Sequence, residues 1–209
     1  METESYCTIL SGGETEFEEK KSRFICYSMP VSKEEEAVSF IRSIQKKHPD
    51  ATHNVWAYHL DGGNQTRYSD DGEPTGTAGM PVLETIRKKD VTNIAVVITR
   101  YFGGIQLGAG GLVRAYSHGA ARAIDAGRVV RFEKYTEFQV SLSYGDYQKF
   151  LSEAPKMKIL TDKVDYSESV IADCAVKKDR WEPVLKAFAE WFNGQVSPTV
   201  TGERFDYEK

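Results

Sequence analysis

Residues 94–126 read IAVVITRYFGGIQLGAGGLVRAYSHGAARAIDA and predict a strand, a loop and a helix in succession. The run from Ile94 to Thr99 is apolar on both faces, a pattern typical of a strand in the middle of a sheet. A glycine-rich loop follows, and the helix is expected from Leu112 to Ala126. Small residues recur at every fourth position of that helix, at Ala115, Gly119 and Ala123. Their lack of bulk predicts that the helix backbone packs closely on the sheet.

The chain before this stretch starts with a strand pair and a helix. Residues 16–30 alternate with period two and predict two strands that leave one sheet face exposed. Ser32 and Glu35 have the spacing of a capping box, in which each side chain bonds the backbone N–H of the other residue. We therefore expect a helix from about Lys33 to Lys47, where apolar residues recur at helical spacing.

Two further strands and a short helix are expected before residue 94. Residues 53–60 are rich in strand formers, and Gly62 with Gly63 supplies a turn into a second strand at residues 65–68. Pro81 suits the first position of a helix, because an N–H at that position has no partner within the helix. A short helix is therefore expected from Pro81.

After Gly127 the pattern restarts with a second set of elements. Strand, helix, strand, strand, helix and strand are expected at residues 136–142, 146–154, 158–166, 170–176, 181–192 and 195–207. This order is that of the split βαβ, or ferredoxin-like, arrangement, which folds as one unit. We therefore predict an α+β protein of two domains, residues 1–130 and residues 131–209.

Composition places the chain among ordinary globular proteins. Of its 209 residues 40% are hydrophobic, 28% are charged and 11% are aromatic, which excludes a disordered chain. No apolar run approaches the roughly 18 residues of a membrane helix, and the first residues, METESYCTIL, lack a secretory signal. We expect a cytoplasmic protein without a membrane partner, in which Cys7, Cys26 and Cys174 are reduced and structural.

The charge of the chain is uneven. A formal net charge of −4 argues against non-specific coating of nucleic acid, which relies on clustered Lys and Arg. Basic residues nevertheless outnumber acidic ones at residues 84–122, and the reverse holds at residues 61–73. A local basic surface is therefore compatible with the negative total.

The loop before the predicted helix is unusually rich in glycine. It holds Gly103, Gly104, Gly108, Gly110 and Gly111. Glycine lets backbone N–H groups approach an anion, and the helix that follows adds the positive end of its dipole. The loop does not match the dinucleotide fingerprint G-x-G-x-x-G, because Val113 stands where the third glycine belongs. It does not match the P-loop either, because Ala109 stands where the lysine belongs. An anion-binding loop and a plain tight connection therefore stay open as alternatives.

Cations and aromatic rings flank this loop. Arg100, Tyr101 and Phe102 precede it, and Arg114 lies in the helix that follows. Phosphate-binding cations beside stackable rings are the parts that single-stranded nucleic-acid sites use. In the alternative interpretation the rings belong to the core, and the arginines pair with the acidic turn at residues 70–73.

That acidic turn carries Asp70, Asp71 and Glu73. Carboxylates can hold a hard cation such as Mg²⁺, although such a run more often serves the turn itself. His53 and His59 stand about 20 Å apart on one strand and cannot share a metal. The chain has neither a nucleophile motif nor a zinc motif. We therefore expect no cofactor other than this candidate Mg²⁺, and we favour a protein without catalytic activity.

Two segments together resemble the YigZ/IMPACT family, SDDGEPTGTAGMP at residues 69–81 and ITRYFGGIQLGAGGLVRAY at residues 98–116. The resemblance is strong over residues 23–126, and the C-terminal unit is similar to the small second domain of bacterial members of the YvyE type. It implies an N-terminal domain of ribosomal-protein and GHMP-kinase type, like the second domain of ribosomal protein S-five. It also implies a ferredoxin-like domain similar to the last domain of elongation factor G.

The resemblance further implies a role in translation. Eukaryotic relatives are tied to translational regulation, and bacterial members to nucleic acid or the ribosome, although fold alone does not fix function. Our first hypothesis is a translation-associated protein that binds RNA or the ribosome at residues 100–114, where arginines hold phosphates and aromatic rings stack. The alternatives are an enzyme that binds a nucleotide at this loop with Mg²⁺ on the acidic turn, and an adaptor that binds a protein partner through the ferredoxin-like sheet.

Overall fold

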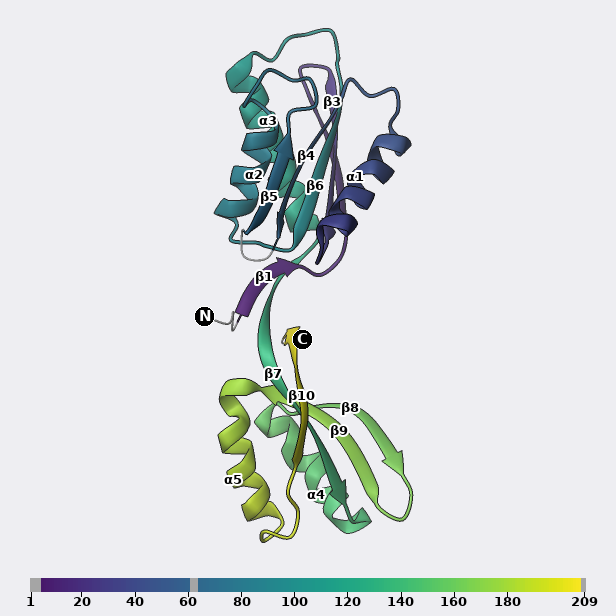
Figure 1. Ribbon diagram of the computed structural model, residues 1–209, viewed down its shortest axis with the longest axis vertical. Coiled ribbons are helices and arrows are strands. Elements are labelled where there is room, and N and C mark those ends of the chain that lie inside the picture. The colour runs from purple at the N-terminus through teal and green to yellow at the C-terminus, as the bar shows by residue number, and fades with distance from the viewer. Residues whose placement is uncertain (1–4, 61–63, 208–209) are drawn as a thin grey trace. The chain divides into compact units, whose positions relative to one another are not determined.

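The computed structural model describes residues 5–60 and 64–207 (Figure 1). Within these residues the chain is a mixed α/β protein with five α-helices and two sheets. It divides into two compact units, residues 6–131 and residues 132–207 with residue 5. The division falls inside two strands, β1 (Ser5–Ile9) and β7 (Val129–Leu142).

The first unit is built on an antiparallel sheet in the order β2-β3-β6-β4-β5. Its strands are β2 (Gly13–Glu19), β3 (Ser22–Pro30), β4 (His53–Leu60), β5 (Gln65–Ser69) and β6 (Ile94–Tyr101). The predicted strands of this half are thus confirmed, while the predicted turn at Gly62 and Gly63 lies outside the described residues. β6 is buried from Ile94 to Arg100, as expected of a middle strand.

Helices cover both faces of this sheet (Figure 1). α1 (Glu34–Lys47) packs on one face, and α2 (Gly79–Lys88) and α3 (Ala109–Ala126) pack on the other. The expectation that the strand pair leaves one face exposed is wrong for β3, because helices lie on both of its sides. Ile25 on the α1 side and Cys26 on the α3 side are both buried.

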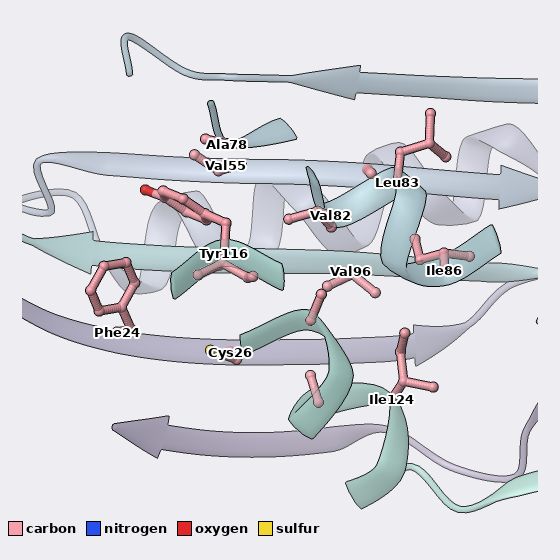
Figure 2. Packing of buried hydrophobic residues seen from close by; sticks show 14 of the residues in the cluster. Phe24, Cys26, Val55, Ala78, Val82, Leu83, Ile86, Val96, Tyr116 and Ile124 are labelled. Atoms are coloured by element: carbon pink, nitrogen blue, oxygen red, sulfur yellow. The ribbon is translucent and has the colours of Figure 1, made fainter. Parts of the chain in front are cut away.

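The core between the sheet and the α2–α3 layer is apolar and closely packed (Figure 2). It includes Phe24, Val55, Val82, Val96, Tyr116 and Ile124. Gly119 shows how close α3 comes to the sheet, since a Cβ at this position would lie 2.7 Å from Sγ of Cys26. The prediction that the small-residue face of α3 packs on the sheet is confirmed.

The start of α1 differs from the predicted capping box. The helix begins at Glu34, and Lys33 in the capping position makes no side-chain bond to the helix. Ser32 instead bonds the carboxylate of Glu36, through its N–H at 2.7 Å and its Oγ at 3.0 Å. The predicted partner, Glu35, is therefore wrong by one residue, because the chain enters the helix one position later than the motif assumes.

The other two helices of this unit begin earlier than predicted. α2 begins at Gly79 rather than Pro81. α3 begins at Ala109 rather than Leu112, and Leu112 already donates its N–H to the carbonyl of Gly108 at 2.9 Å. The end of the glycine-rich segment is therefore the first turn of α3.

The second unit has the predicted β-α-β-β-α-β order. After β7 come α4 (Tyr144–Glu153), β8 (Leu160–Tyr166), β9 (Val170–Lys177), α5 (Trp181–Trp191) and β10 (Thr199–Tyr207), with 3-10 turns at Ala154–Met157 and Lys178–Arg180. Four of its strands pair antiparallel in the order β10-β7-β9-β8, and β1, which was not predicted, also pairs with β7 in this five-stranded sheet. Both helices pack on one face of the sheet, where Phe150 of α4 and Phe188 of α5 join Phe138 of β7 in the core.

The cysteines are free thiols that fill space in these cores. Cys26 and Cys174 are buried and Cys7 is half-buried. Burial raises the pKa of Cys26 and of Cys174 to about 12, so both thiols stay protonated. Of the helices that the structure describes, none is long and apolar enough to cross a membrane.

Candidate functional site

Several of the predicted site residues meet at one end of the first unit's sheet. β6 ends there, and its antiparallel neighbours β3 and β4 begin there, so that Arg100 pairs with Phe24 on one side and His53 on the other. The acidic turn and the glycine-rich loop bond to this end through Glu73 and Gly103. The register of three strands thus brings together segments that are far apart in the sequence.

A buried ion pair lies at the centre of this end. Arg100 Nη1 donates to Glu73 Oε1 at 2.6 Å, and the two side chains are only 5% and 3% exposed. The Tyr116 hydroxyl of α3 donates to the same oxygen at 2.7 Å. Burial and the neighbouring Glu73 carboxylate raise the pKa of Tyr116, which keeps its hydroxyl a donor. The three side chains tie the acidic turn and α3 to the end of β6.

Arg100 has further partners on β3 and in the loop. Its Nη2 donates to Ser22 Oγ at 3.2 Å, and that oxygen also accepts the Gly103 N–H at 3.3 Å. The rings of Phe24 and Phe102 each lie 5.5 Å from the guanidinium carbon, within the range of cation–π attraction. Both terminal nitrogens of the guanidinium are thus bonded within the protein, while its Nε is buried without a hydrogen-bond partner among the described residues. Arg100 is therefore enclosed in the core rather than presented at the surface.

His53 belongs to the same cluster, although it was not among the site residues predicted from the sequence. Its Nδ1–H donates to the carbonyl of Asp71 at 2.8 Å, and its Nε2 lies 3.8 Å from Glu73 Oε2. The only signal for this placement is that His53 opens the strand that pairs with β6. That signal becomes informative only when the register opposite Arg100 is known.

The remaining acidic side chains serve the turn. Asp70 accepts three backbone N–H groups, from Gly76, Ala78 and Gly79, at 2.9, 3.1 and 2.8 Å. Asp71 accepts the Asn54 N–H at 2.6 Å. These bonds fit the turn interpretation of the acidic run. In the described part of the chain, no group of three or more His, Cys, Asp or Glu side chains is placed to hold a metal.

The two aromatic residues after Arg100 do not form one platform. The Tyr101 hydroxyl lies 2.9 Å from Nδ1 of His48, and the ring packs against the core on the α1 face. Phe102 is 47% exposed and lies beside Arg100. Phe102 is therefore the one of the two that can meet a ligand on the α3 side.

The glycines of the loop are subject to different structural constraints. Gly103 touches the β2–β3 turn so closely that a Cβ there would overlap the carbonyl of Lys21. Gly104 and Gly108 have φ values of +82° and +75°, which favour glycine, and open space beside them. Gly110 and Gly111 lie in the first turn of α3, and Gly110 is exposed.

A groove runs beside this first turn of α3 and is here called the α3 groove. It measures about 460 Å³, and its lining includes Phe17, Lys20, Leu107, Gly111, Arg114 and His118. Glu18 and Glu19 also line it. Arg114 Nη1 lies only 3.7 Å from where a Cβ of Gly110 would be, so the guanidinium rests against the start of the helix. Of the residues predicted for the site, Arg114 and Gly111 line this groove, and Arg100 lies apart from it in the core.

Comparisons with known proteins bear on both units. The family model described as "Impact N-terminal domain" matches residues 20–124, and the one described as "Domain of unknown function (DUF1949)" matches residues 140–195. "IMPACT family member YvyE" of Bacillus subtilis is 40% identical over 188 residues, which are 90% of this chain and 85% of that protein. "IMPACT family member YigZ" of Escherichia coli is 41% identical over 128 residues, 60% of this chain and 63% of that protein. A solved structure titled "Crystal structure of an hypothetical protein" is 30% identical, with a TM-score of 0.61, and covers 96% of this chain and 98% of its own.

Proposed function

The chain belongs to the IMPACT family, and from this premise we propose that it is a non-enzymatic, translation-associated protein that binds RNA, free or in the ribosome, through the α3 groove. The association with translation rests on the family resemblance. The binding site rests on the chemistry of the groove. The two parts of the proposal are therefore supported independently.

The observation that carries the proposal is the placement of Arg114 at the start of α3. The first N–H groups of a helix have no partners within it, and together with the helix dipole they favour an anion. Arg114 adds a full positive charge beside Gly110, and no carboxylate of a described residue pairs with it. A phosphate group bound there would contact both the first N–H groups of α3 and the Arg114 guanidinium, and groups of these two kinds hold nucleic-acid phosphates in proteins.

The surroundings of Arg114 supply the other parts of an RNA site. Lys20 and His118 line the same groove, and Phe17 offers a ring there. Phe102 is exposed at the start of the glycine-rich loop, where it is available for stacking on a base. Arg100 has a positioning role in this proposal, because its bonds to Glu73 and Ser22 hold the acidic turn and the start of β3 against the end of β6.

A finer fold assignment is part of the same proposal. The strand order β10-β7-β9-β8 with two helices on one face supports a ferredoxin-like second unit, as in the last domain of elongation factor G. Three layers around an antiparallel sheet support the ribosomal-protein and GHMP-kinase type for the first unit. Both types occur in proteins of translation according to the family resemblance, which agrees with the proposed role.

A binding experiment on the full chain tests the proposal. The fluorescence anisotropy of labelled single-stranded RNA, double-stranded RNA and DNA is measured over a range of salt concentrations. We expect Arg114→Ala to weaken RNA binding about tenfold, or about 1.4 kcal/mol, and to reduce the slope of log affinity against log salt by about 0.7 to 0.9. Arg87→Ala is the matched control, because Arg87 is an exposed arginine of α2 outside the groove, paired with Glu84.

Removal of negative charge from the α3 groove gives a second readout. Glu18 and Glu19 face the groove, so Glu18→Gln with Glu19→Gln should tighten RNA binding by removing repulsion of the phosphates. Equal affinities for the parent chain, Arg114→Ala and the glutamine variant would overturn the proposal. Thermal stabilisation by ATP with Mg²⁺ in the absence of any RNA binding would replace it with the nucleotide-binding enzyme.

A further inference from the structure

The face of the first unit's sheet that carries α1 has an open flank. The core beneath α1 is made of residues from α1, β3, β4 and β6 with Val31, and no described residue of β5 belongs to it. Between α1 and β5 lies a groove of about 310 Å³, here called the β5 groove. Its lining includes Glu34, Ile41 and Arg42 of α1, Trp56 and Tyr58 of β4, and Arg67 of β5.

Two stacked rings form one wall of the β5 groove. Trp56 and Tyr58 lie with ring centroids 5.9 Å apart and planes within 5° of parallel. Tyr58 is 1% exposed and its hydroxyl donates to Glu34 Oε1 at 2.6 Å, so burial and this bond hold its ring in one position. Trp56 is only half-buried, and Ile41 gives the groove an apolar side. The Trp56 indole is thus held by its stack with Tyr58 and still has exposed surface on which a planar ring can stack.

Two arginines stand on opposite walls of this groove. Arg67 on β5 is 69% exposed, and its Nη1 lies 3.5 Å from Glu34 Oε1. Arg42 on α1 is exposed, and no described carboxylate pairs with it. Two guanidinium groups against one carboxylate leave the groove positive, although the chain as a whole is negative. The groove therefore suits a ligand that combines a planar ring with negative charge.

We propose that the β5 groove binds a nucleotide of a single-stranded RNA, with the base stacked on Trp56 and the flanking phosphates held by Arg42 and Arg67. An aromatic side chain of a peptide would also stack on the indole, but it has an anion on each side of its ring only where acidic residues flank it. Every base within a nucleic-acid strand is flanked by two phosphates, so a nucleotide always supplies both the ring and the charges. The site lies on the opposite sheet face from the α3 groove and goes beyond the function proposed above.

Trp56 itself provides the readout. It is the one tryptophan of residues 6–131, and the other two are Trp181 and Trp191 in the second unit. In the full chain with Trp181→Phe and Trp191→Phe, fluorescence reports on Trp56 alone, and circular dichroism confirms that the chain is folded. Triadenylate is expected to quench this fluorescence in a saturable manner, adenosine to bind more weakly, and inorganic phosphate to have no effect.

Single substitutions in the same background test the assigned roles. Arg42→Ala and Arg67→Ala should each weaken triadenylate binding about tenfold and lower its salt slope by about 0.7. Glu34→Gln should strengthen binding, because it removes a competing charge while leaving an acceptor for Tyr58. Arg87→Ala is the matched control and should change nothing.

The outcomes separate this inference from the proposed function. Triadenylate is too short to span both faces of the sheet, so Arg114→Ala should leave the quenching of Trp56 unchanged. Absence of quenching, or triadenylate binding as tight in Arg42→Ala and Arg67→Ala as in the parent background, would overturn the inference even if longer RNA still binds through Arg114. Saturable quenching by adenosine monophosphate but not by triadenylate would also overturn it, in favour of a free nucleotide.

Discussion

At the scale of single residues, the contact between Arg100 and Glu73 shows why a basic residue beside a glycine loop is not automatically a ligand contact. Both side chains are almost fully buried, and both hold other groups of the same cluster. Removing charges from water is costly, so such a pair persists only with good geometry and further hydrogen bonds. Its role here is to fix the acidic turn and the start of the glycine-rich loop.

Removal of one partner of this pair should be strongly destabilising. Glu73→Ala leaves the Arg100 guanidinium buried without its carboxylate, and we expect a loss of about 3–5 kcal/mol in the free energy of unfolding. The measurement is urea denaturation followed by circular dichroism. Glu84→Ala, which breaks the exposed pair with Arg87, should cost at most about 1 kcal/mol.

The double variant Glu73→Leu with Arg100→Met separates the buried charge from the packing. It removes both charges and keeps apolar volume, but the Tyr116 hydroxyl loses its acceptor, so it should recover part of the stability that Glu73→Ala loses. A double variant as unstable as Glu73→Ala would contradict this account of the cluster.

His48 gives the chain a pH-dependent contact on the α1 side. Its Nε2 lies 2.7 Å from the Tyr27 hydroxyl and its Nδ1 lies 2.9 Å from the Tyr101 hydroxyl. Burial, with help from Lys47 and Arg23, lowers the pKa of His48. Glu14 acts weakly in the opposite direction. The folded state therefore favours the neutral imidazole, which donates to one hydroxyl and accepts from the other.

The sign of the resulting pH dependence follows from linkage. Because the pKa is lower in the folded than in the unfolded state, the unfolded chain binds more protons between the two values. This contribution to stability is present above the unfolded pKa of about 6.5 and is lost as the pH falls through the folded value. Urea denaturation between these limits should show stability rising with pH, and His48→Gln should flatten the rise; an unchanged slope in that variant would contradict the assignment.

At the scale of elements, α3 is the helix whose packing the sequence predicts best. Its small residues at every fourth position could be identified without a structure, and the contact with Cys26 confirms their role. Gly119→Ala should therefore overpack this contact and destabilise the chain by about 1–3 kcal/mol. Gly110→Ala on the exposed first turn is the control, since its Cβ would lie 3.7 Å from the end of the flexible Arg114 side chain, an ordinary van der Waals distance. Thermal unfolding of both variants is the measurement, and equal shifts would contradict the argument.

The element boundaries and the candidate site were predictable to different degrees. Strand and helix order follow from periodicity, which is local, and the structure has the predicted order in both units except for β1, a strand that was not predicted. The second buried face of β3 was missed because α1 covers it from a separate stretch of the chain. The pairing of Arg100 with Glu73 and the nearness of His53 depend on strand register and turn geometry, which residue spacing does not encode.

At the scale of the whole molecule, the division into two units sets the main question about function. Residues 6–131 contain both grooves described above, while the second unit offers the open face of an antiparallel sheet. A net charge of −4 implies that any RNA contact must be local, as the α3 groove would be. The adaptor alternative instead assigns binding to residues 132–207.

The most direct test of the central claim is to map RNA contacts on the full chain by amide NMR. Titration with a short single-stranded RNA should shift the N–H signals at the start of α3, those of Gly108, Gly110, Gly111 and Arg114, and Arg114→Ala should suppress these shifts. Shifts confined to residues 132–207, with the amides around Gly110 unmoved, would contradict the account.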